Sequence, residues 1–458
     1  MNIEHLFLFE YVKKGASVSI YGLGACGNSY IQQIERTSWC NIVGVYDRKN
    51  RFDSYRNYEI EDFCKLNCDY IVIAIESKEQ ATLIYNELIS RGVNREIILN
   101  LNMRRGSFPC PNEEKITNEI LVTYVDGGGF GDVLLGVLFL SQIKKMINGS
   151  NLICLISRFS DYFSKFHFID KVIDYQIVQD NLEIEKEKSD VFFIGHNIVL
   201  IEKYDSEIIK KNEPKLWEYC DKNHTLQDEL FGNDINNFRY TKYALLNNKN
   251  RIEQMDLAGA IPILRTDLLE IPIQENTKQI LKSFGVFEKK YITINRDSGS
   301  GSNKGTKLWP SKYYIDFLKY IKDTYPELVI ISVGSSIGES LRKYVDVDTT
   351  GRTSLEQIEI LLSNALIHIG TEGGLVHLNH FLGGVSMVFF GSTSPDVFGY
   401  PENINLTSNV CNERCECMTD NWALECPKGE NEPPCMHTLY PEVAIIEFEK
   451  FMSKRGTL

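Results

Sequence analysis

Short apolar runs alternate along the chain with longer segments in which hydrophobic residues recur every three or four positions. The runs have the pattern of buried β-strands, and the segments between them have that of amphipathic helices. Strands that alternate with helices predict a parallel sheet with helices on both faces. In the first part of the chain we expect strands at 18–21, 42–47, 70–75 and 96–101, and a helix over 78–92.

The alternation continues in two further segments beyond a proline- and charge-rich linker at 104–114. The stretch 200–270 is polar and helix-like, and its elements have no clear boundaries. Ser354 and Gln357 have the spacing of the capping pair that opens a helix. In these segments we expect strands at 120–126, 151–157, 171–178, 190–196, 291–295, 328–334 and 366–370, and a helix over 311–325.

The length of 458 residues exceeds one ordinary core and predicts two or three domains. The net charge of −13 argues against nucleic acid as a partner, because phosphate binding needs a basic face. No apolar run reaches the ~18–20 residues that span a bilayer, and the N-terminal segment lacks the pattern of a signal peptide. We therefore expect a cytoplasmic α/β protein of three units, with boundaries at 1–108, 117–270 and 275–458.

A glycine loop follows the first expected strand and precedes a helix. Glycines there let the backbone approach a pyrophosphate at a helix N-terminus, and an acid about 20 residues further on can bind a ribose. Gly22, Gly24, Gly27 and Asp47 fit this fingerprint, so NAD(P) or another nucleotide is a candidate ligand of the first unit. The alternative is a Rossmann-type unit whose turn needs glycine although its site is empty or binds something else.

A second glycine loop, 126–132, also lies between an expected strand and an expected helix. Asp132 at its end has two interpretations. As the N-cap of the helix, its carboxylate would accept a hydrogen bond from a backbone N–H. As a general base at the carboxyl edge of a parallel sheet, it would accept a proton from a substrate hydroxyl. The loop alone favours the cap.

A third loop, 295–310, is rich in glycine, serine and lysine and lies between a strand and a helix. Free N–H groups, hydroxyls and ammonium groups are the parts of a phosphate cradle, although a flexible surface loop has the same composition. Trp309 and Pro310, directly before the helix, predict a fixed turn.

The motif Thr-Glu-Gly-Gly follows another expected strand and opens a helix. Gly373 and Gly374 expose the N–H groups of the helix N-terminus, which favours an anion. Glu372 would compete with that anion unless the ligand carries hydroxyls beside its phosphates, as a nucleotide sugar does. His377 lies in the first turn of the helix, whereas His380 is interpreted as a satisfied core or surface residue.

Five of the twelve cysteines crowd into the 25 residues from 411 to 435. In a cytoplasmic protein, four thiolates at this density indicate a structural zinc or iron site. The spacing differs from paired CxxC knuckles, so a loop with free thiols, or a disulfide formed in air, is the alternative. The candidate ligands, four of five, are Cys411, Cys415, Cys417, Cys426 and Cys435.

Four motifs occur together in the order found in one enzyme family: GFGD at 129–132, KLWPSKYY at 307–314, GRTSLEQIEILLSNALIHIGTEGGLVHL at 351–378 and VFFGSTSP at 388–395. Over 117–458 the chain resembles glycosyltransferase family 9, the ADP-heptose–lipopolysaccharide heptosyltransferases and their relatives. The resemblance implies a GT-B arrangement of two Rossmann-like domains, with the acceptor on the first and the nucleotide sugar on the second. Residues 1–108 would form a third, small Rossmann-like domain before them.

The resemblance also implies roles for single residues. Asp132 matches the loop aspartate that acts as base, Lys307 matches a lysine on the donor phosphates, and Glu339 resembles an acid near the nucleoside. The other implied donor-binding positions are Thr306, Glu372, Gly373, Gly374 and His377. Glu372 stands where the family has aspartate and Gly373 where it has threonine, so the chain departs from the family where the sugar is read.

The implied reaction is an inverting, metal-independent transfer that requires no cofactor for catalysis. The implied partners are a nucleotide sugar similar to ADP-heptose and a glycan, lipid-linked or protein acceptor, which leaves open peripheral contact with the inner membrane and a homo-oligomer. Some autotransporter-modifying relatives have a four-cysteine iron site. The cysteine cluster of this chain resembles that site, but its cysteines are spaced differently. Two competing hypotheses are an NAD-dependent oxidoreductase and a non-catalytic carbohydrate-binding subunit.

Overall fold

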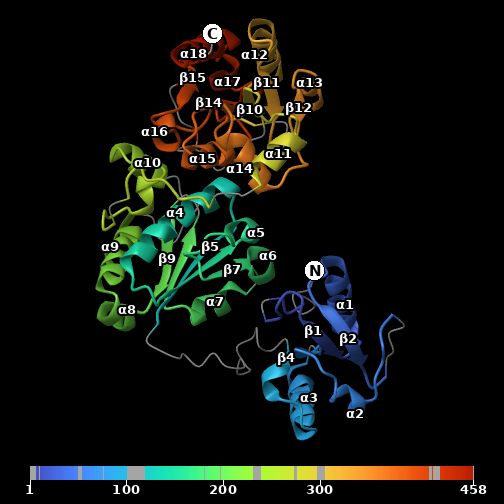
Figure 1. The fold of residues 1–458 in the computed structure, drawn as a ribbon. Coiled ribbons are helices and arrows are strands. Elements are labelled where there is room, and N and C mark those ends of the chain that lie inside the picture. The colour runs from blue at the N-terminus through green and yellow to red at the C-terminus, as the bar shows by residue number, and fades with distance from the viewer. Residues whose placement is uncertain are drawn as a thin grey trace. The chain divides into compact units, whose positions relative to one another are not determined.

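Three sheets, each accompanied by helices, confirm the α/β class in the computed structural model (Figure 1). The linker predicted at 104–114 lies outside the described residues. These are 7–9, 11–49, 54–75, 77–100, 119–179, 181–195, 198–230, 239–261, 263–272, 276–296, 305–411, 415 and 423–456. The chain divides into two compact units, Met1–Leu121 with Ile173–Asp190 and Val122–Val172 with Val191–Leu458.

The first sheet has the strand order β2-β1-β3-β4, and its strand pairs are parallel. Its strands are β1 (Ser17–Tyr21), β2 (Asn41–Tyr46), β3 (Tyr70–Ile73) and β4 (Ile98–Asn100). The helices of this segment are α1 (Ala25–Thr37), α2 (Ile60–Phe63), α3 (Lys78–Ser90) and the short 3-10 helix η2 (Arg95–Ile97). The strand order reverses beside β1, which is where nucleotide-binding sheets place their ligand.

The second sheet has the order β7-β6-β5-β8-β9, with β9 antiparallel to β8. Its strands are β5 (Leu121–Asp126), β6 (Leu152–Ser157), β7 (Lys171–Asp174), β8 (Val191–Gly195) and β9 (Val199–Tyr204). The helices are α4 (Phe130–Met146), α5 (Ser160–Phe163), α6 (Tyr175–Val178) and α7 (Leu182–Lys188). The strand predicted at 171–178 is wrong beyond Asp174, because the Asp174 side chain accepts the Gln176 N–H at 2.8 Å and starts α6.

The polar stretch between the second and third sheets is largely helical after β9. It contains α8 (Ser206–Asn212), α9 (Pro214–Leu230), α10 (Arg239–Leu246) and the 3-10 helix η4 (Glu253–Met255). Within the described part of the chain, no helix combines the length and the apolar character needed to cross a bilayer.

The third sheet is parallel, with the order β12-β11-β10-β13-β14-β15. Counted along the chain, this is the Rossmann order 3-2-1-4-5-6, whose ligand crevice lies between the first and fourth strands. The strands are β10 (Tyr291–Asn295), β11 (Val329–Ser332), β12 (Val347–Asp348), β13 (His368–Thr371), β14 (Ser386–Phe390) and β15 (Ile404–Thr407). The helices are α11 (Thr277–Ser283), α12 (Ser311–Thr324), α13 (Glu339–Arg342), α14 (Leu355–Ser363), α15 (Gly374–Phe381), α16 (Pro395–Phe398), α17 (Pro434–His437) and α18 (Pro441–Lys454).

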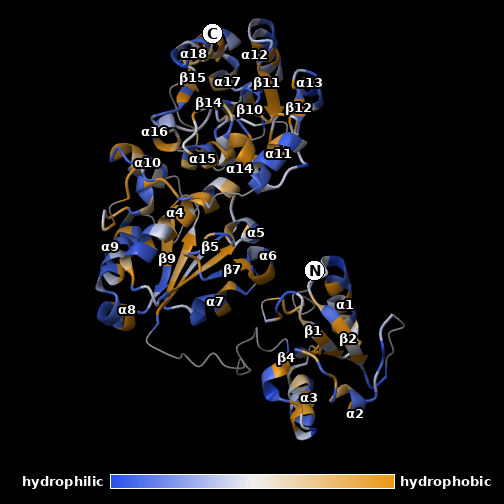
Figure 2. Ribbon diagram, viewed as in Figure 1, coloured by the Kyte–Doolittle hydropathy of each residue, from blue (hydrophilic) through white to orange (hydrophobic). Residues whose placement is uncertain are grey.

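The capping pair predicted for α14 is confirmed. The Ser354 hydroxyl accepts the Gln357 N–H, and the Gln357 side chain accepts the Ser354 N–H, so two otherwise unpaired donors are satisfied. Figure 2 shows hydrophobic residues on the strands and along α4, and hydrophilic residues on α8 and α11. The apolar periodicity of the sequence therefore corresponds to burial in the fold.

Trp309 anchors the core of the third sheet. It is fully buried, its ring stacks on Phe389 with centroids 4.0 Å apart, and its Nε1 donates a 2.7 Å hydrogen bond to the Leu439 carbonyl. Pro310, the next residue, is the N-cap of α12, as expected for a fixed turn. Lys307 lies two residues before Trp309, so the same packing holds the chain that carries Lys307.

We expect Trp309→Ala to lower the free energy of unfolding by about 3–5 kcal/mol, because it empties a large buried volume and removes a hydrogen bond. Urea denaturation of the purified protein measures the change. Trp217→Ala is the matched control, since Trp217 is partly exposed and its Nε1 bonds a surface serine, Ser206. An equal loss in the two variants would contradict the central packing role of Trp309.

Candidate active site

Helices α4 and α15 meet at their N-terminal ends within the second unit. A methyl group built on Gly131 would lie 2.7 Å from His377 Cδ2, and one on Gly374 would lie 2.9 Å from the Gly131 nitrogen. Side chains at these positions would force the helices apart, so glycine is required. The caps of the two helices, Gly129 and Gly373, also lack side chains. The contact therefore brings two positive helix ends together.

Asp132 projects from the first turn of α4 and pairs with Arg251. The N-cap interpretation of Asp132 is wrong, because α4 begins at Phe130 after Gly129. The Asp132 Oδ1 accepts a 2.7 Å hydrogen bond from the Arg251 guanidinium. The side chain of Arg251 is 4% exposed and that of Asp132 is 39% exposed, so a buried cation orients a carboxylate that solvent can reach.

Arg251 also connects this carboxylate to the third sheet. Its backbone N–H donates a 2.7 Å hydrogen bond to the carbonyl of Val397, in α16. Sequence reasoning missed Arg251, because it lies in the polar stretch before the third sheet and belongs to no motif. The sequence shows only an arginine in a segment whose helices have no clear boundaries, and such an arginine is too common to identify a site.

A second carboxyl group, Asp126, ends β5 beside Asp132. It is 1% exposed and accepts hydrogen bonds from the Gly128 N–H at 2.7 Å and the Tyr124 hydroxyl at 3.4 Å. Burial and the negative charge of Asp132 raise the pKa of Asp126 well above its ordinary value, although the Gly128 N–H and Arg251 oppose them. The surroundings of Asp126 therefore favour its protonated form more than those of an ordinary carboxyl group do, and Asp132 is the exposed acid of the two.

Lys307 and Glu372 form a buried ion pair at the crevice of the third sheet. The Glu372 Oε2 accepts hydrogen bonds from the Lys307 ammonium at 2.5 Å and the Thr393 hydroxyl at 3.2 Å. Burial favours the neutral form of Glu372, but Lys307 and then His377 and Thr393 hold its pKa below the ordinary value. An acid is thus compatible with a helix N-terminus here, because a lysine balances its charge.

The strand register places this pair. Asn295 at the end of β10 is opposite Gly370 in β13, so the two strands end nearly level. Lys307 comes from the connection after β10 and Glu372 directly follows β13, which are the two strands that flank the crevice of a Rossmann sheet. Residues 297–304, which make up most of the predicted phosphate cradle, lie outside the described residues, and the description resumes at residue 305.

His377 is buried against a tyrosine. Its Nδ1 lies 2.6 Å from the Tyr400 hydroxyl, and burial lowers the pKa of His377 to about 4 although Glu372 and Asp132 oppose this. The Tyr400 ring stacks on His380 with centroids 3.6 Å apart. His380 is buried as expected and contacts Glu402 through Nδ1. His377 is thus a neutral group within electrostatic reach of both site carboxylates.

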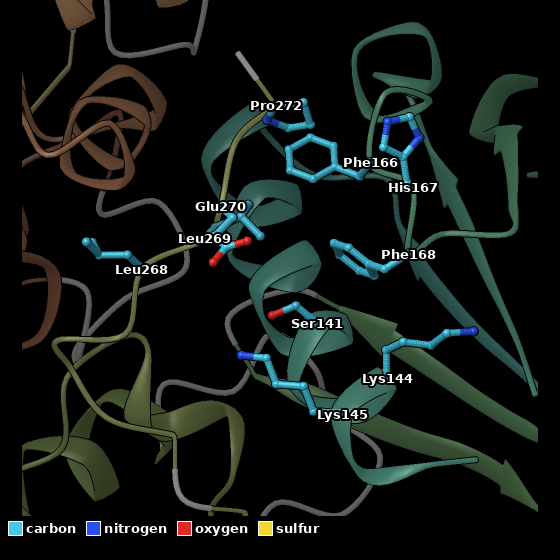
Figure 3. A pocket seen from close by; sticks show the side chains of 10 residues that line it. All are labelled: Ser141, Lys144, Lys145, Phe166, His167, Phe168, Leu268, Leu269, Glu270 and Pro272. Atoms are coloured by element: carbon cyan, nitrogen blue, oxygen red, sulfur yellow. The ribbon is translucent and has the colours of Figure 1, made fainter. Parts of the chain in front are cut away.

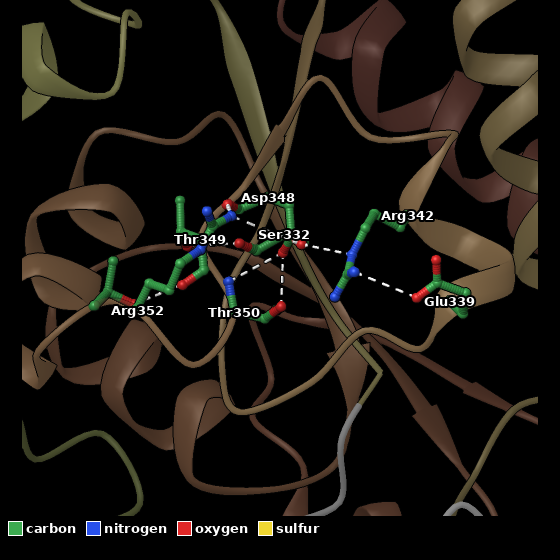
Figure 4. Close-up of polar contacts among 8 residues, drawn as sticks. Ser332, Glu339, Arg342, Asp348, Thr349, Thr350 and Arg352 are labelled. Carbon is green, nitrogen blue, oxygen red and sulfur yellow. Dashed lines mark hydrogen bonds and ion pairs between the residues drawn. The ribbon is translucent and has the colours of Figure 1, made fainter.

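Thr306 and Glu339 occupy different surroundings. Thr306 is 1% exposed and its hydroxyl donates to Ser392 at 2.8 Å, so it fixes the chain before Lys307. Glu339 begins α13 and pairs with Arg342 at 3.3 Å, and Arg342 also bonds Asp348 at the end of β12 (Figure 4). Glu339 therefore lies at the carboxyl edge of the third sheet, and its ion pair among the described residues is with Arg342.

The glycine loop of the first unit forms the expected tight turn. Gly22 has φ +103°, and a methyl group on Gly27 would lie 1.8 Å from the Gly22 carbonyl oxygen. Gly24 is the N-cap of α1. Asp47 follows β2, and its Oδ2 accepts the Leu23 N–H at 2.7 Å. The fingerprint residues therefore lie together, and Asp47 holds the loop.

Four of the five clustered cysteines lie among the described residues, and Cys417 lies outside them. Burial raises the pKa of Cys435 to about 11, and the nearby thiols of the other three contribute to the same direction. The thiols of Cys411, Cys415 and Cys426 therefore lie within electrostatic range of Cys435. No three His, Cys, Asp or Glu side chains in the described ranges are nevertheless arranged to hold a metal ion.

A cavity of about 390 Å³ lies along the C-terminal half of α4 (Figure 3). Ser141 and Lys145 line it from the helix, and Phe166 and Leu269 line it from two loops. Ser141 is nine residues beyond Asp132, which corresponds to about 13 Å along a helix. The cavity is therefore distinct from the site around Asp132.

Residues 221–426 match the model of glycosyltransferase family 9 (heptosyltransferase), which confirms the predicted family for this stretch and makes it a glycosyltransferase domain. Lys307, Glu372 and His377 lie inside the match, and so does Arg251, whereas Asp132 precedes it. No curated protein matches the chain.

Three solved structures are similar to the chain at low identity. ADP-heptose lipopolysaccharide heptosyltransferase II of E. coli is 13% identical with a TM-score of 0.46, over 73% of this chain and 99% of that one. A family 9 glycosyltransferase of Veillonella parvula is 14% identical with a TM-score of 0.46, over 75% and 100%. The iron-containing dodecameric glycosyltransferase TibC of enterotoxigenic E. coli is 11% identical with a TM-score of 0.45, over 73% and 76%.

We expect Asp126→Asn to change how stability depends on pH. Because the folded pKa of Asp126 is raised, its contribution to stability is complete below the unfolded pKa of about 3.9 and is lost as pH rises through the folded pKa. Asparagine keeps the shape and the acceptor for Gly128 but cannot ionise. The variant should therefore gain stability relative to the wild type as pH increases from about 4 to 8.

Urea unfolding at a series of pH values measures this difference. Asp161→Asn, at an exposed position in α5, is the control and should follow the wild type throughout. The assignment of a buried proton to Asp126 fails if Asp126→Asn and the wild type lose stability in parallel.

Proposed function

We propose that the chain is an inverting glycosyltransferase that moves a sugar from a nucleoside diphosphate to an acceptor hydroxyl. The observation that carries the proposal is the meeting of the α4 and α15 N-termini through Gly131 and Gly374, because α4 carries Asp132 and α15 follows Glu372, the partner of Lys307. His377 supports it, because its pKa responds to both Asp132 and Glu372.

Asp132 is the proposed base. It takes the proton of the acceptor hydroxyl while the acceptor oxygen forms a bond to the anomeric carbon and the bond from that carbon to the phosphate oxygen breaks. The nucleoside diphosphate leaves with the bonding electrons. Arg251 orients the base through Oδ1.

The charge on the leaving diphosphate is met by Lys307 and by the amide groups at the helix N-termini. Lys307 already pairs with Glu372, so the ammonium is shared between the carboxylate and the donor. These groups supply the positive charge that the step needs, and we propose a metal-independent transfer. Glu372 is also proposed to accept hydrogen bonds from hydroxyl groups of the sugar.

The proposed donor is similar to ADP-heptose, in keeping with the heptosyltransferase description of the matched family. Glu372 and Gly373 depart from the family motif, so the sugar can differ from heptose. The proposed acceptor is a bacterial surface glycan or glycoprotein, glycosylated in the cytoplasm or at the cytoplasmic face of the membrane. NAD(P) or another nucleotide at the Gly22 loop stays a prediction.

The test is a screen of ADP-, UDP-, GDP- and CDP-sugars, with NAD and NADP, by thermal unfolding. One class of nucleotide sugar should raise the melting temperature by mass action. Stabilisation by NAD alone would favour the oxidoreductase, and donor binding without turnover on any acceptor would favour the non-catalytic subunit.

With a productive donor and acceptor, Asp132→Asn should keep donor binding and lower kcat by about 10²–10⁴, because a positioned base contributes that much. Steady-state kinetics and the same thermal assay measure the two effects separately. Asp161→Asn, an exposed residue outside the site, serves as the control. Unchanged turnover of Asp132→Asn would show that another group is the base.

We also propose that four of the clustered cysteines bind one structural zinc or iron ion, supported by the density of the cluster in the sequence and by the influence of Cys411, Cys415 and Cys426 on Cys435. Protein purified without oxygen should contain about one metal per chain by mass spectrometry. Cys435→Ser should lose the metal and unfold at a lower temperature, whereas Cys40→Ser, at a buried thiol of the first unit, should keep it. Absence of metal from the wild type would leave the cluster as plain thiols.

A further inference from the structure

The Tyr400 hydroxyl contacts one of the two ring nitrogens of His377. Tyr400 is 2% exposed, and its hydroxyl lies 2.6 Å from His377 Nδ1. Burial raises the pKa of Tyr400, so the phenol keeps its proton. A buried phenol needs an acceptor for that proton, and in the described part of the chain the acceptor is His377 Nδ1. Nδ1 therefore carries no hydrogen of its own.

His377 is neutral near pH 7, because burial lowers its pKa to about 4. A neutral imidazole has one N–H and one acceptor nitrogen. With Nδ1 as the acceptor, the N–H must be on Nε2. His377 is thus a hydrogen-bond donor at Nε2. In this tautomer its Nε2 cannot accept a proton, so His377 cannot replace Asp132 as the proposed base.

The Nε2 edge of the ring lies at the junction of α4 and α15. Cδ2, which is bonded to Nε2, is the atom that a methyl group on Gly131 would approach to 2.7 Å. This edge therefore faces the end of α4 that carries Asp132, and Nδ1 faces Tyr400.

Two further contacts hold Tyr400 in place. Its ring stacks on His380, with centroids 3.6 Å apart and an interplanar angle of 11°, and its backbone carbonyl accepts a 3.0 Å hydrogen bond from the Asn405 side-chain amide. His380 is in turn bound to Glu402. A tyrosine fixed in this way can hold the imidazole at one angle and in one tautomer.

We propose that Tyr400 is a positioning residue that keeps His377 as an Nε2–H donor to an oxygen atom of the nucleotide-sugar donor. The hydrogen bond from Nε2 to the nucleotide sugar rests on the proposed function, whereas the tautomer of His377 does not. The Tyr400 hydroxyl contacts no substrate in this scheme and acts through His377.

The tautomer is tested without turnover by ¹⁵N NMR of the full chain labelled at histidine. In the wild type His377 should be the Nε2–H tautomer. Tyr400→Phe keeps the ring and its stacking on His380 but removes the hydroxyl, and should give a mixture of the two tautomers. An Nδ1–H tautomer in the wild type, or no change in Tyr400→Phe, would overturn the inference.

The consequence for the donor is tested by a double-mutant cycle with His377→Gln, whose side-chain amide places an N–H near the position of Nε2. Tyr400→Phe alone should raise the KM for the nucleotide sugar about tenfold, as for a lost hydrogen bond to a charged ligand. In the His377→Gln background the same change should have almost no effect, because the tautomer no longer matters.

Tyr291→Phe is the matched control. Tyr291 is also buried, and its hydroxyl donates a 2.9 Å hydrogen bond to the Leu361 carbonyl in α14. Tyr291 begins β10, so it lies at the end of the strand opposite the crevice. It should leave the KM unchanged. Equal effects of the two Tyr→Phe changes, or additive effects of Tyr400→Phe and His377→Gln, would reduce Tyr400 to a structural residue and overturn the proposal.

The failure of the inference and the failure of the proposed function give different results. If the tautomer changes as expected but no nucleotide sugar binds, the proposed function fails and the donor role of Nε2 fails with it. If nucleotide sugars bind and turn over normally in Tyr400→Phe, the inference fails and the proposed function stands.

Discussion

The close approach of α4 and α15 is the constraint on which the site depends. Gly131 and Gly374 leave no room for a methyl group between the two helices, so the backbones of the two N-termini approach each other closely at these positions. The helices belong to different sheets, and this contact brings the ends of both sheets to one place. Asp132, in the first turn of α4, and His377, in the first turn of α15, take their positions from these two helix ends.

Two positive helix ends in one place require a particular distribution of charge. Among the described residues of the site, Arg251 and Lys307 are each bound to one carboxylate. Burial and the charge of Asp132 raise the pKa of the third carboxyl, Asp126, and so disfavour its charged form. The two ion pairs neutralise their own charges, and the two helix ends add a field that favours an anion.

The sequence predicted the local parts of this arrangement well. The alternation of strands and helices, the capping pair at Ser354 and the tight turn at Gly22 depend on residues close together in the chain, and the structure confirms them. Most of the third loop, 297–304, lies outside the described residues. The sequence accounts for Glu372 only through the hydroxyl groups of a ligand, because it does not reveal that Lys307, 65 positions away, pairs with the carboxylate.

The contacts that sequence reasoning missed join residues that are far apart in the chain. Arg251 and Asp132 are 119 positions apart, and no periodicity or motif links them. Tyr400 became relevant only when folding brought it against His377. The strand β9 also escaped prediction, because it pairs antiparallel at the sheet edge and its sequence turns polar after Ile201. Contacts of this kind follow from tertiary packing, which single-sequence patterns do not encode.

The division between predicted and missed residues also divides their proposed roles. The residues that motifs identify, Asp132, Lys307 and His377, are those that would touch the ligand. The residues that only the fold identifies, Arg251 and Tyr400, contact Asp132 and His377. An exposed carboxylate can take several orientations and a neutral histidine has two tautomers. In the proposed scheme, Arg251 selects one orientation of Asp132 and Tyr400 selects one tautomer of His377. The chemistry of the site is therefore fixed as much by these two buried side chains as by the motif residues they hold.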